Sequence, residues 1–217
     1  MTELALREGV IATARAMNAE GINRGTSGNV SARWRTDGFD GYLVTPSAVA
    51  YDELLPVDIV AMPLAGEAAD AIGTRPPSSE WRFHRDIYRA REDAGAIVHA
   101  HSPFATSLAC LRQGVPAFHY MVAIAGGSDI RCAPYATFGT QALSDHAVAA
   151  LEGRRACLLA NHGAIAVGGS LREALALAKE VENLAEMYWR ALQVGTPILL
   201  DDAEMEAVLF KFRGYGR

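Results

Sequence analysis

The sequence is poor in cysteine and has no long apolar run. Its three cysteines, Cys110, Cys132 and Cys157, are an odd number without close spacing. A disulfide framework or a thiolate zinc site is therefore not expected. We expect instead that the cysteines are buried thiols in a protein of the reducing cytoplasm. No segment has the length of apolar residues that spans a bilayer. Charged residues are spread through the first twenty positions, which leaves no apolar core for a signal peptide.

Positive charge is also in short supply. Lys and Arg together number 20 against 25 Asp and Glu, giving a net charge of −5. Binding of nucleic acid by bulk charge is therefore not expected, although a local anion site is compatible with this balance. Half of the residues are hydrophobic and 21% are charged, which is typical of a globular protein. The length of 217 residues predicts one domain, residues 1–217, with a full hydrophobic core.

Helical and extended patterns alternate along the chain, which predicts a three-layer α/β domain with a central sheet. The helix over residues 79–91 is expected to have Ser78 or Ser79 as its cap. Amphipathic patterns predict the helices at 2–20, 79–91, 103–112, 171–192 and 201–212. Residues 114–140 are expected to be rich in loops. Short β-leaning runs predict the strands at 29–34, 42–45, 58–62, 96–101, 154–160 and 164–167.

A pair of histidines gives the sharpest pattern in the sequence. His99 and His101 lie two residues apart in a predicted strand, so their imidazoles project from the same face and can reach one ion. His162 lies in a predicted turn before Gly163, where a side chain can aim inward. Three nitrogen ligands beside an open or carboxylate position describe a catalytic zinc site. Unrelated histidines that satisfy hydrogen bonds in the core would produce the same spacing by chance.

Three segments rich in small and hydroxyl residues lie within the first eighty positions. They are a loop at 25–29, a turn at 45–48 and the start of a helix at 77–80. Backbone amides, hydroxyls and a helix N-terminus together form a phosphate cradle that needs no lysine. None of the segments matches the nucleotide-binding glycine loops. A turn followed by a helix cap would explain each segment taken singly.

Together these motifs resemble the class II aldolase and adducin family, and within it the L-fuculose-1-phosphate aldolases most. The likeness covers nearly the whole chain, through residues 119–140 and on to 211–216. It implies a single three-layer α/β/α domain with a central, mainly antiparallel sheet. The motifs that carry it are Gly25-Thr26-Ser27-Gly28-Asn29-Val30-Ser31, Thr45-Pro46-Ser47, Pro77-Ser78-Ser79-Glu80, His99-Ala100-His101 and Asn161-His162-Gly163.

The resemblance also implies roles for single residues. Glu80 would be the catalytic acid/base and would bind the metal when no substrate is present. Tyr120 would enter the site of a neighbouring subunit in a C4 homotetramer, and Tyr215 would act from a mobile tail, whose shortness bears on closure. One Zn²⁺ ion per subunit would be held by His99, His101 and His162. The substrate phosphate would be bound by Gly28, Asn29, Ser47, Ala48, Ser78 and Ser79, with Ser47-Ala48 replacing the Thr-Gly of the fuculose enzymes.

The implied reaction is retro-aldol cleavage of a ketose 1-phosphate to dihydroxyacetone phosphate and an aldehyde. The substrate would be the phosphate of L-fuculose, 5-deoxyribulose or 5-methylthioribulose. Zinc would stabilise the enediolate as a Lewis acid, while Glu80 and Tyr120 would move protons. Three alternatives stay open. They are a pentulose-phosphate 4-epimerase, whose members carry aspartate in place of Glu80, a methylthioribulose-phosphate dehydratase, and a non-enzymatic adducin-like binding module, whose members lack the metal histidines. No nucleic acid or membrane partner is expected.

Overall fold

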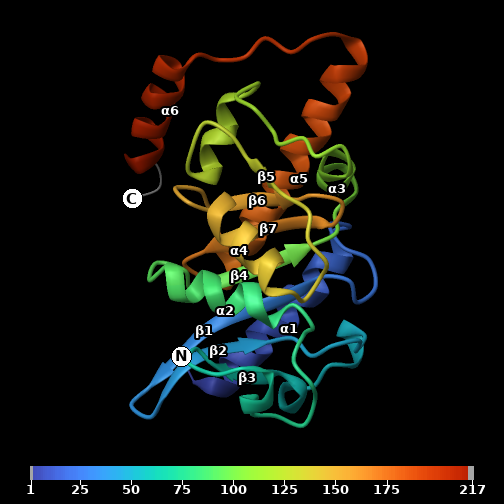
Figure 1. Cartoon of the computed structure of the whole chain (residues 1–217), viewed down its shortest axis with the longest axis vertical. Coiled ribbons are helices and arrows are strands. Elements are labelled where there is room, and N and C mark those ends of the chain that lie inside the picture. Colours follow the sequence, from blue (N-terminus) through green and yellow to red (C-terminus); the bar gives the residue numbers. More distant parts are fainter. Residues whose placement is uncertain (1, 215–217) are drawn as a thin grey trace.

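A seven-stranded sheet runs through the molecule in the order β3-β2-β1-β4-β7-β6-β5 (Figure 1). The computed structural model describes residues 2–214, so Tyr215 lies outside the described residues. The strands are β1 Asn29–Thr36, β2 Phe39–Val44, β3 Val60–Pro63, β4 Ala96–Ala100, β5 Arg131–Ala133, β6 Ala156–Leu159 and β7 Gly163–Gly168.

The sheet is mixed, which corrects the expectation of a mainly antiparallel one. β5 pairs with β6 in parallel, whereas neighbouring strands from β3 to β6 pair antiparallel. The reason is helix α4, Gln141–Ala150, which connects β5 to β6. Parallel neighbours require such a crossover, because a tight hairpin can join only antiparallel strands. Neither β5 nor α4 was predicted. The inward side of α4 is largely alanine, with Ala147 and Ala150 beside Leu143, so its amphipathic pattern is weak.

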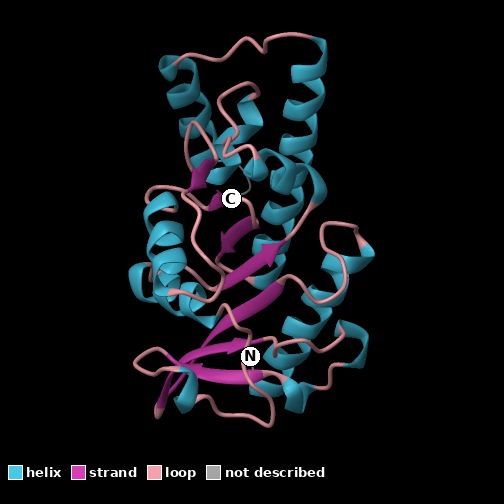
Figure 2. Cartoon of the chain, turned by 45° about the vertical axis from the view of Figure 1, so that its right-hand side comes forward, coloured by secondary structure: helices cyan, strands magenta, loops and turns pink. Residues whose placement is uncertain are grey.

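Helices cover both faces of the sheet (Figure 2). On one face lie α1 Glu3–Ala19, α3 Pro103–Cys110 and α5 Leu171–Val194, and on the other lie α2 Trp81–Ala90 and α4. The last helix, α6 Asp202–Gly214, packs against the short helix η4 Tyr120–Ala125. Among residues 2–214, no helix is both long and apolar enough to cross a membrane.

The N-termini of α1 and α2 show how far local sequence determines where a helix begins. Thr2 caps α1 by accepting a hydrogen bond from the Ala5 amide, as a threonine at this position is expected to do. The predicted cap of α2 at Ser78 or Ser79 is wrong, because Glu80 is the cap residue. Ser78 Oγ instead accepts the Glu80 amide at 3.3 Å. The helix therefore begins later and leaves residues 78–80 in a bend beside the sheet.

Strand β4 divides its side chains between the two faces of the sheet. Ala96, Val98 and Ala100 pack into the core beneath α1 and α5, while Ile97 packs into the core beneath α2 and α4. His99 lies on the same side as Ile97, since side chains alternate along a strand. All five residues of β4 are buried. The strand therefore holds His99 rigidly against α2.

Gly163 allows β7 to start very close to the end of β4. A Cβ atom at this position would lie 2.6 Å from the Ala100 carbonyl oxygen and 2.9 Å from Cδ2 of His101. Real Cβ atoms do not approach a backbone oxygen that closely, so the strands would have to separate. The glycine after His162 is therefore required by packing.

We expect Gly163→Ala to lower the free energy of unfolding by about 1–3 kcal/mol, because the added methyl overpacks the β4–β7 junction. Gly38→Ala is the matched control, since a Cβ atom there meets nothing within 4 Å. The control should change stability by less than about 0.5 kcal/mol. Urea unfolding of both variants measures the difference. Equal stabilities would show that β7 shifts without cost to admit the methyl group.

Candidate active site

Three imidazole rings converge at the ends of neighbouring strands. His99 is in β4, His101 follows its last residue, and His162 is in the turn between β6 and β7. Each pair of ring centroids is 4.9 Å apart, with planes crossed at 75°, 76° and 84°. One nitrogen of each ring lies within 4.8 Å of the others. Mutually perpendicular rings aimed at one point suit a single ion with three nitrogen ligands.

The turn that carries His162 has an unusual backbone. Asn161 adopts a φ of 54°, a left-handed conformation that asparagine tolerates better than most residues. Its amide donates to the Ala109 carbonyl at 3.0 Å, which anchors the turn to α3. This conformation turns His162 back toward the sheet, so the third imidazole meets the pair in β4.

Hydrogen bonding sets the tautomer of His99. Its Nδ1 lies 3.0 Å from the Ala164 carbonyl oxygen and must donate, so Nε2 is the nitrogen that faces the cluster. That Nε2 lies 3.0 Å from Nε2 of His101. Burial, reinforced by the neighbouring His99 and His162, lowers the pKa of His101 to about 4. His101 is therefore neutral at pH 7, the form in which imidazole binds a metal.

Glu80 completes the cluster. Its Oε2 lies 3.1 Å from His99 Nε2, and its Oε1 lies 3.1 Å from His162 Nε2. The side chain is almost fully buried. Burial alone would raise the pKa of Glu80, but the imidazoles of His99 and His162 outweigh it and hold the pKa well below its usual range. Glu80 is therefore a buried anion.

One oxygen of this anion has no hydrogen-bond partner. Within residues 2–214, Oε1 of Glu80 is among the few buried polar atoms left without one, since the His162 contact is not aligned as a hydrogen bond. A buried carboxylate oxygen in that condition is costly unless a cation meets it. Three imidazole nitrogens and one carboxylate are a donor set that zinc and related divalent ions accept. The residues therefore fit a divalent metal.

The predicted phosphate-binding residues lie around one hollow of about 400 Å³, together with Glu80, His101 and His162. Of its described lining residues, none is lysine or arginine. Neutral groups and the N-terminus of α2 are therefore what this hollow offers to an anion. The predicted phosphate-binding residues along its wall are Gly28, Asn29, Ser47, Ala48, Ser78 and Ser79.

Two of the three small-residue segments are tied together by backbone hydrogen bonds. The Ser47 amide donates to the Pro76 carbonyl at 3.2 Å, and the Ser78 amide donates to the Thr45 carbonyl at 3.1 Å. These two amides are thus engaged, and the serine hydroxyls are what remains for a ligand. Because Ser78 Oγ accepts the Glu80 amide, its own hydrogen is free to donate.

Ala48 lies in the turn at residues 45–48, at a position where the fuculose enzymes are expected to have glycine. Its φ is 57°, in the left-handed region that glycine enters without strain and other residues enter at about 1–2 kcal/mol. The backbone at Ala48 therefore keeps the left-handed conformation that a glycine would adopt in this turn. Strain of this kind is common where a loop must present its backbone to a ligand.

Tyr120 does not join this cluster within one chain. It is half exposed at 51% and lines a different hollow, between η4 and α6, with Phe118, Met121 and Lys211 among its neighbours. Tyr215, the other predicted tyrosine, lies outside the described residues. The structure therefore brings together the metal, acid/base and phosphate residues that were predicted, and it separates Tyr120 from them.

Other residues at the hollow were not predicted. Tyr135 and Phe138 reach it from the loop before α4, and 53% and 65% of their surfaces are exposed. His84 lies behind Asn29, with its Nε2 2.5 Å from Asn29 Oδ1. Its position could have been inferred, because it follows Glu80 by four residues on a helix and so shares its face. No comparable periodic signal marks Tyr135 or Phe138.

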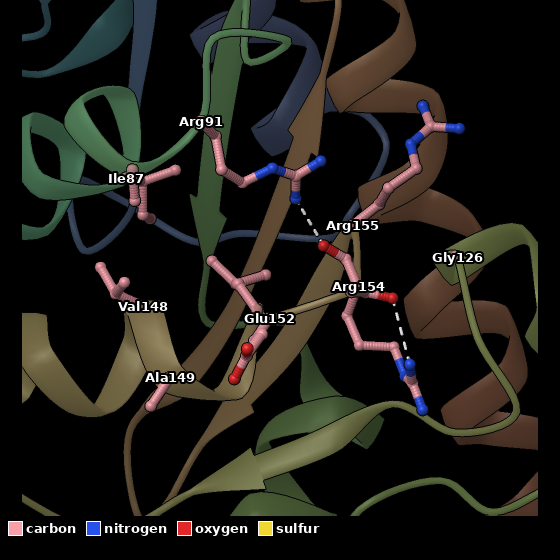
Figure 3. A pocket seen from close by; sticks show the side chains of 11 residues that line it. Ile87, Arg91, Gly126, Val148, Ala149, Glu152, Arg154 and Arg155 are labelled. Atoms are coloured by element: carbon pink, nitrogen blue, oxygen red, sulfur yellow. Dashed lines mark hydrogen bonds between the residues drawn. The ribbon is translucent and has the colours of Figure 1, made fainter.

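A separate hollow of about 510 Å³ lies at the opposite end of α2 from the imidazoles (Figure 3). Ile87, Arg91 and Arg154 line it. The Arg91 guanidinium donates to the Arg154 carbonyl and pairs with Asp93, while Arg154 Nε donates to Asp129 Oδ1 at 2.7 Å. Its cations are therefore engaged within the fold, and the chemistry is concentrated at the three histidines.

Comparison with known proteins agrees with this geometry. The family described as Class II Aldolase and Adducin N-terminal domain matches residues 8–189. A 5-methylthioribulose-1-phosphate/5-deoxyribulose-1-phosphate aldolase of Rhodospirillum rubrum is 55% identical over 99% of this chain and 94% of its own length. An L-fuculose phosphate aldolase of Escherichia coli is 45% identical over 95% of this chain and 94% of its own length.

A solved structure extends the likeness to three dimensions. An L-fuculose 1-phosphate aldolase superimposes with a TM-score of 0.89 at 41% identity, covering 96% of each chain. The order of motifs, the three-dimensional match and the family match over 8–189 all lead to one assignment. The chain belongs to the class II aldolase and adducin family.

Proposed function

We propose that this protein is a metal-dependent aldehyde-lyase that cleaves a ketose 1-phosphate to dihydroxyacetone phosphate and an aldehyde. The observation that carries the proposal is the joining of two sites in one hollow. A buried carboxylate with an unsatisfied oxygen faces three imidazoles, and a cradle of neutral donors lies beside it. A phosphate held in the cradle would place an adjacent carbonyl next to the metal ligands.

Two aromatic rings in the lining of the hollow favour a substrate with an apolar group. Tyr135 and Phe138 supply these rings, which suit a methyl or methylthio group better than a charged one. The Rhodospirillum rubrum relative is named for 5-methylthioribulose 1-phosphate and 5-deoxyribulose 1-phosphate. We therefore place these two compounds first and L-fuculose 1-phosphate, which also ends in a methyl group, next.

Each part of the site has its own task in this reaction. A divalent ion on His99, His101 and His162, with zinc our choice, would supply Lewis-acid stabilisation of the negative charge that develops beside the carbonyl. Glu80 would transfer a proton to and from the substrate carbon through Oε1, the carboxylate oxygen that accepts no hydrogen bond and lies beside His162. The serine hydroxyls of the cradle, with Gly28, Asn29 and Ala48, would bind the phosphate and orient the sugar.

Tyr120 would act on the site of a neighbouring subunit. It lines a hollow of its own between η4 and α6, and half of its surface is exposed, so its hydroxyl is available to a second chain. We propose a C4 homotetramer in which Tyr120 exchanges a proton with the departing aldehyde oxygen and Tyr215 closes over the substrate. The three free cysteines are in keeping with a cytoplasmic enzyme.

The first test is a panel of these three ketose phosphates, assayed for release of dihydroxyacetone phosphate. We expect activity that depends on one bound divalent ion per chain. His99→Ala should lose both ion and activity, because it removes one of three ligands. His146→Ala is the control, since that partly exposed imidazole lies away from the cluster and is hydrogen-bonded to the Pro134 carbonyl. Metal analysis and chelation measure the dependence, and full activity after complete chelation would exclude this mechanism.

Glu80→Gln should fold and assemble normally but lose roughly 10²–10⁴-fold in turnover, as expected when a general acid/base is removed. Exchange of the carbon-bound proton of dihydroxyacetone phosphate with solvent should fall with it. Glu92→Gln is the matched control, because that carboxylate is 90% exposed. Isotope exchange followed by NMR measures the step directly. Undiminished exchange in Glu80→Gln would assign the base to another residue.

Tyr120→Phe should strongly reduce cleavage while metal content, assembly and proton exchange stay nearly unchanged, because only the hydroxyl is removed. Inactive Tyr120→Phe and Glu80→Gln subunits should regain activity when mixed after partial dissociation. Sites that pair an intact Glu80 with an intact Tyr120 from the neighbour would form in such tetramers. Each variant reassembled alone is the control. Mixed tetramers without activity would place both residues in the site of one chain.

A further inference from the structure

A buried chain of hydrogen bonds leads away from the site into the interface between α2 and β1, which lie side by side (Figure 1). On α2 the residues are Glu80, His84 and Tyr88, each one helical turn after the last. On β1 they are Asn29 and Ser31, which share a face of the strand. The period of the helix and the period of the strand therefore bring five polar side chains into one row.

The distances along this row are those of hydrogen bonds. Tyr88 OH lies 2.9 Å from Ser31 Oγ, and Ser31 Oγ lies 2.7 Å from His84 Nδ1. His84 Nε2 lies 2.5 Å from Asn29 Oδ1, and Asn29 Nδ2 lies 2.9 Å from Glu80 Oε2. All five side chains are buried, and those of Ser31 and His84 are 0% exposed. Water therefore does not compete for these bonds.

The chemistry of the groups gives the row a single direction. A carboxylate can only accept, so Asn29 must present its amide nitrogen to Glu80 and its oxygen to His84. His84 then carries its hydrogen on Nε2, and its Nδ1 accepts from the Ser31 hydroxyl. Ser31 in turn accepts from Tyr88. Every donor in the row thus points toward Glu80, an arrangement in which neighbouring bonds strengthen one another.

The row holds one oxygen of Glu80 by a hydrogen bond and leaves the other, beside His162, without one. Asn29 engages Oε2, while Oε1 has no hydrogen-bond partner within residues 2–214. A reversed Asn29 amide would place its oxygen against the carboxylate and repel it. His84 prevents this reversal, because its Nε2 hydrogen needs an acceptor and the amide nitrogen is not one.

We propose that His84 is a positioning residue for catalysis. It acts through Asn29 to hold Oε2 of Glu80, which leaves Oε1, beside His162, for proton transfer. The inference rests on the proposed role of Glu80 as acid/base. It assigns to His84 no contact with substrate or metal, and it makes turnover, more than substrate binding, depend on the Nε2–H of a histidine in the core.

Two substitutions of His84 separate this role from simple packing. In His84→Gln the side-chain amide reaches the place of Nε2 and can still donate to Asn29. In His84→Asn the shorter amide reaches only the place of Nδ1, so Asn29 loses its donor. Removal of a supporting hydrogen bond of this kind costs about 10–100-fold in activity. His146→Asn, at a partly exposed position on α4, is the control for the same chemical change.

We expect His84→Asn to lower kcat by about 10–100-fold, with proton exchange on dihydroxyacetone phosphate falling in parallel. KM should change less than kcat, because Asn29 is only one of several groups proposed to bind the phosphate and keeps a second amide hydrogen for it. His84→Gln should recover most of the lost kcat. Equal kcat values for the two variants would overturn the inference, as would a loss confined to KM. If wild type cleaves none of the ketose phosphates, it is the proposed function that fails. Should His84→Asn not fold, Tyr88→Phe replaces it, with a lower kcat expected and an unchanged kcat contradicting the inference.

Discussion

The register of β4 between β1 and β7 is the constraint on which the whole site depends. In this register Asn29 lies opposite His99, and His99 lies opposite Ile165. A slip of one residue would turn His99 into the core beneath α1 and α5 and bring Val98 to the site, because side chains alternate along a strand. The apolar residues on both sides of β4 fix the register, so hydrophobic packing is what aims the imidazole.

Helix α2 supplies the other groups of the site beside this strand. Its N-terminal bend places Ser78, Ser79 and Glu80 against the hollow, and its inward face meets β1 through His84 and Tyr88. One helix therefore supports both the anion cradle and the buried carboxylate. The cradle is neutral, and the charged group beside it is an anion. On the proposed function, binding of a phosphate in such a place would depend on oriented hydroxyls and on a divalent ion more than on net charge.

Much of this arrangement could be predicted from sequence, for particular physical reasons. The pairing of His99 and His101 could be predicted because a strand has a period of two. The small-residue segments could be identified because tight backbone approaches favour glycine and serine. Strand β5 and helix α4 escaped prediction because a three-residue strand and an alanine-rich helix carry little periodic signal. The cap of α2 was misplaced because Ser78 bonds the backbone two residues ahead. Glu80, His99 and His162 were predicted together because their side chains are chemically distinctive, and the structure places them in one cluster.

The features that could not be predicted from sequence are mostly contacts between elements far apart in the chain. The distance of Tyr120 from the three histidines depends on how η4 packs against α6, which no local pattern records. The row from Glu80 to Tyr88 requires knowing that α2 lies on β1 and not on another strand. Residues whose function is to orient other residues, such as His84, look from sequence like ordinary core positions. Their importance becomes visible only when donors and acceptors are traced from one side chain to the next.

The pairing of β4 has a consequence for folding of the chain during its synthesis on the ribosome. Ala96 pairs with Ala32 on one side and with Gly168 on the other, so the central strand has no hairpin partner near it in sequence. Two long loops must close before it is paired on both edges, which is slow compared with local hairpin formation. The third imidazole, His162, is synthesised just before β7 itself. A nascent chain therefore cannot bring three histidines together until its sheet is nearly complete.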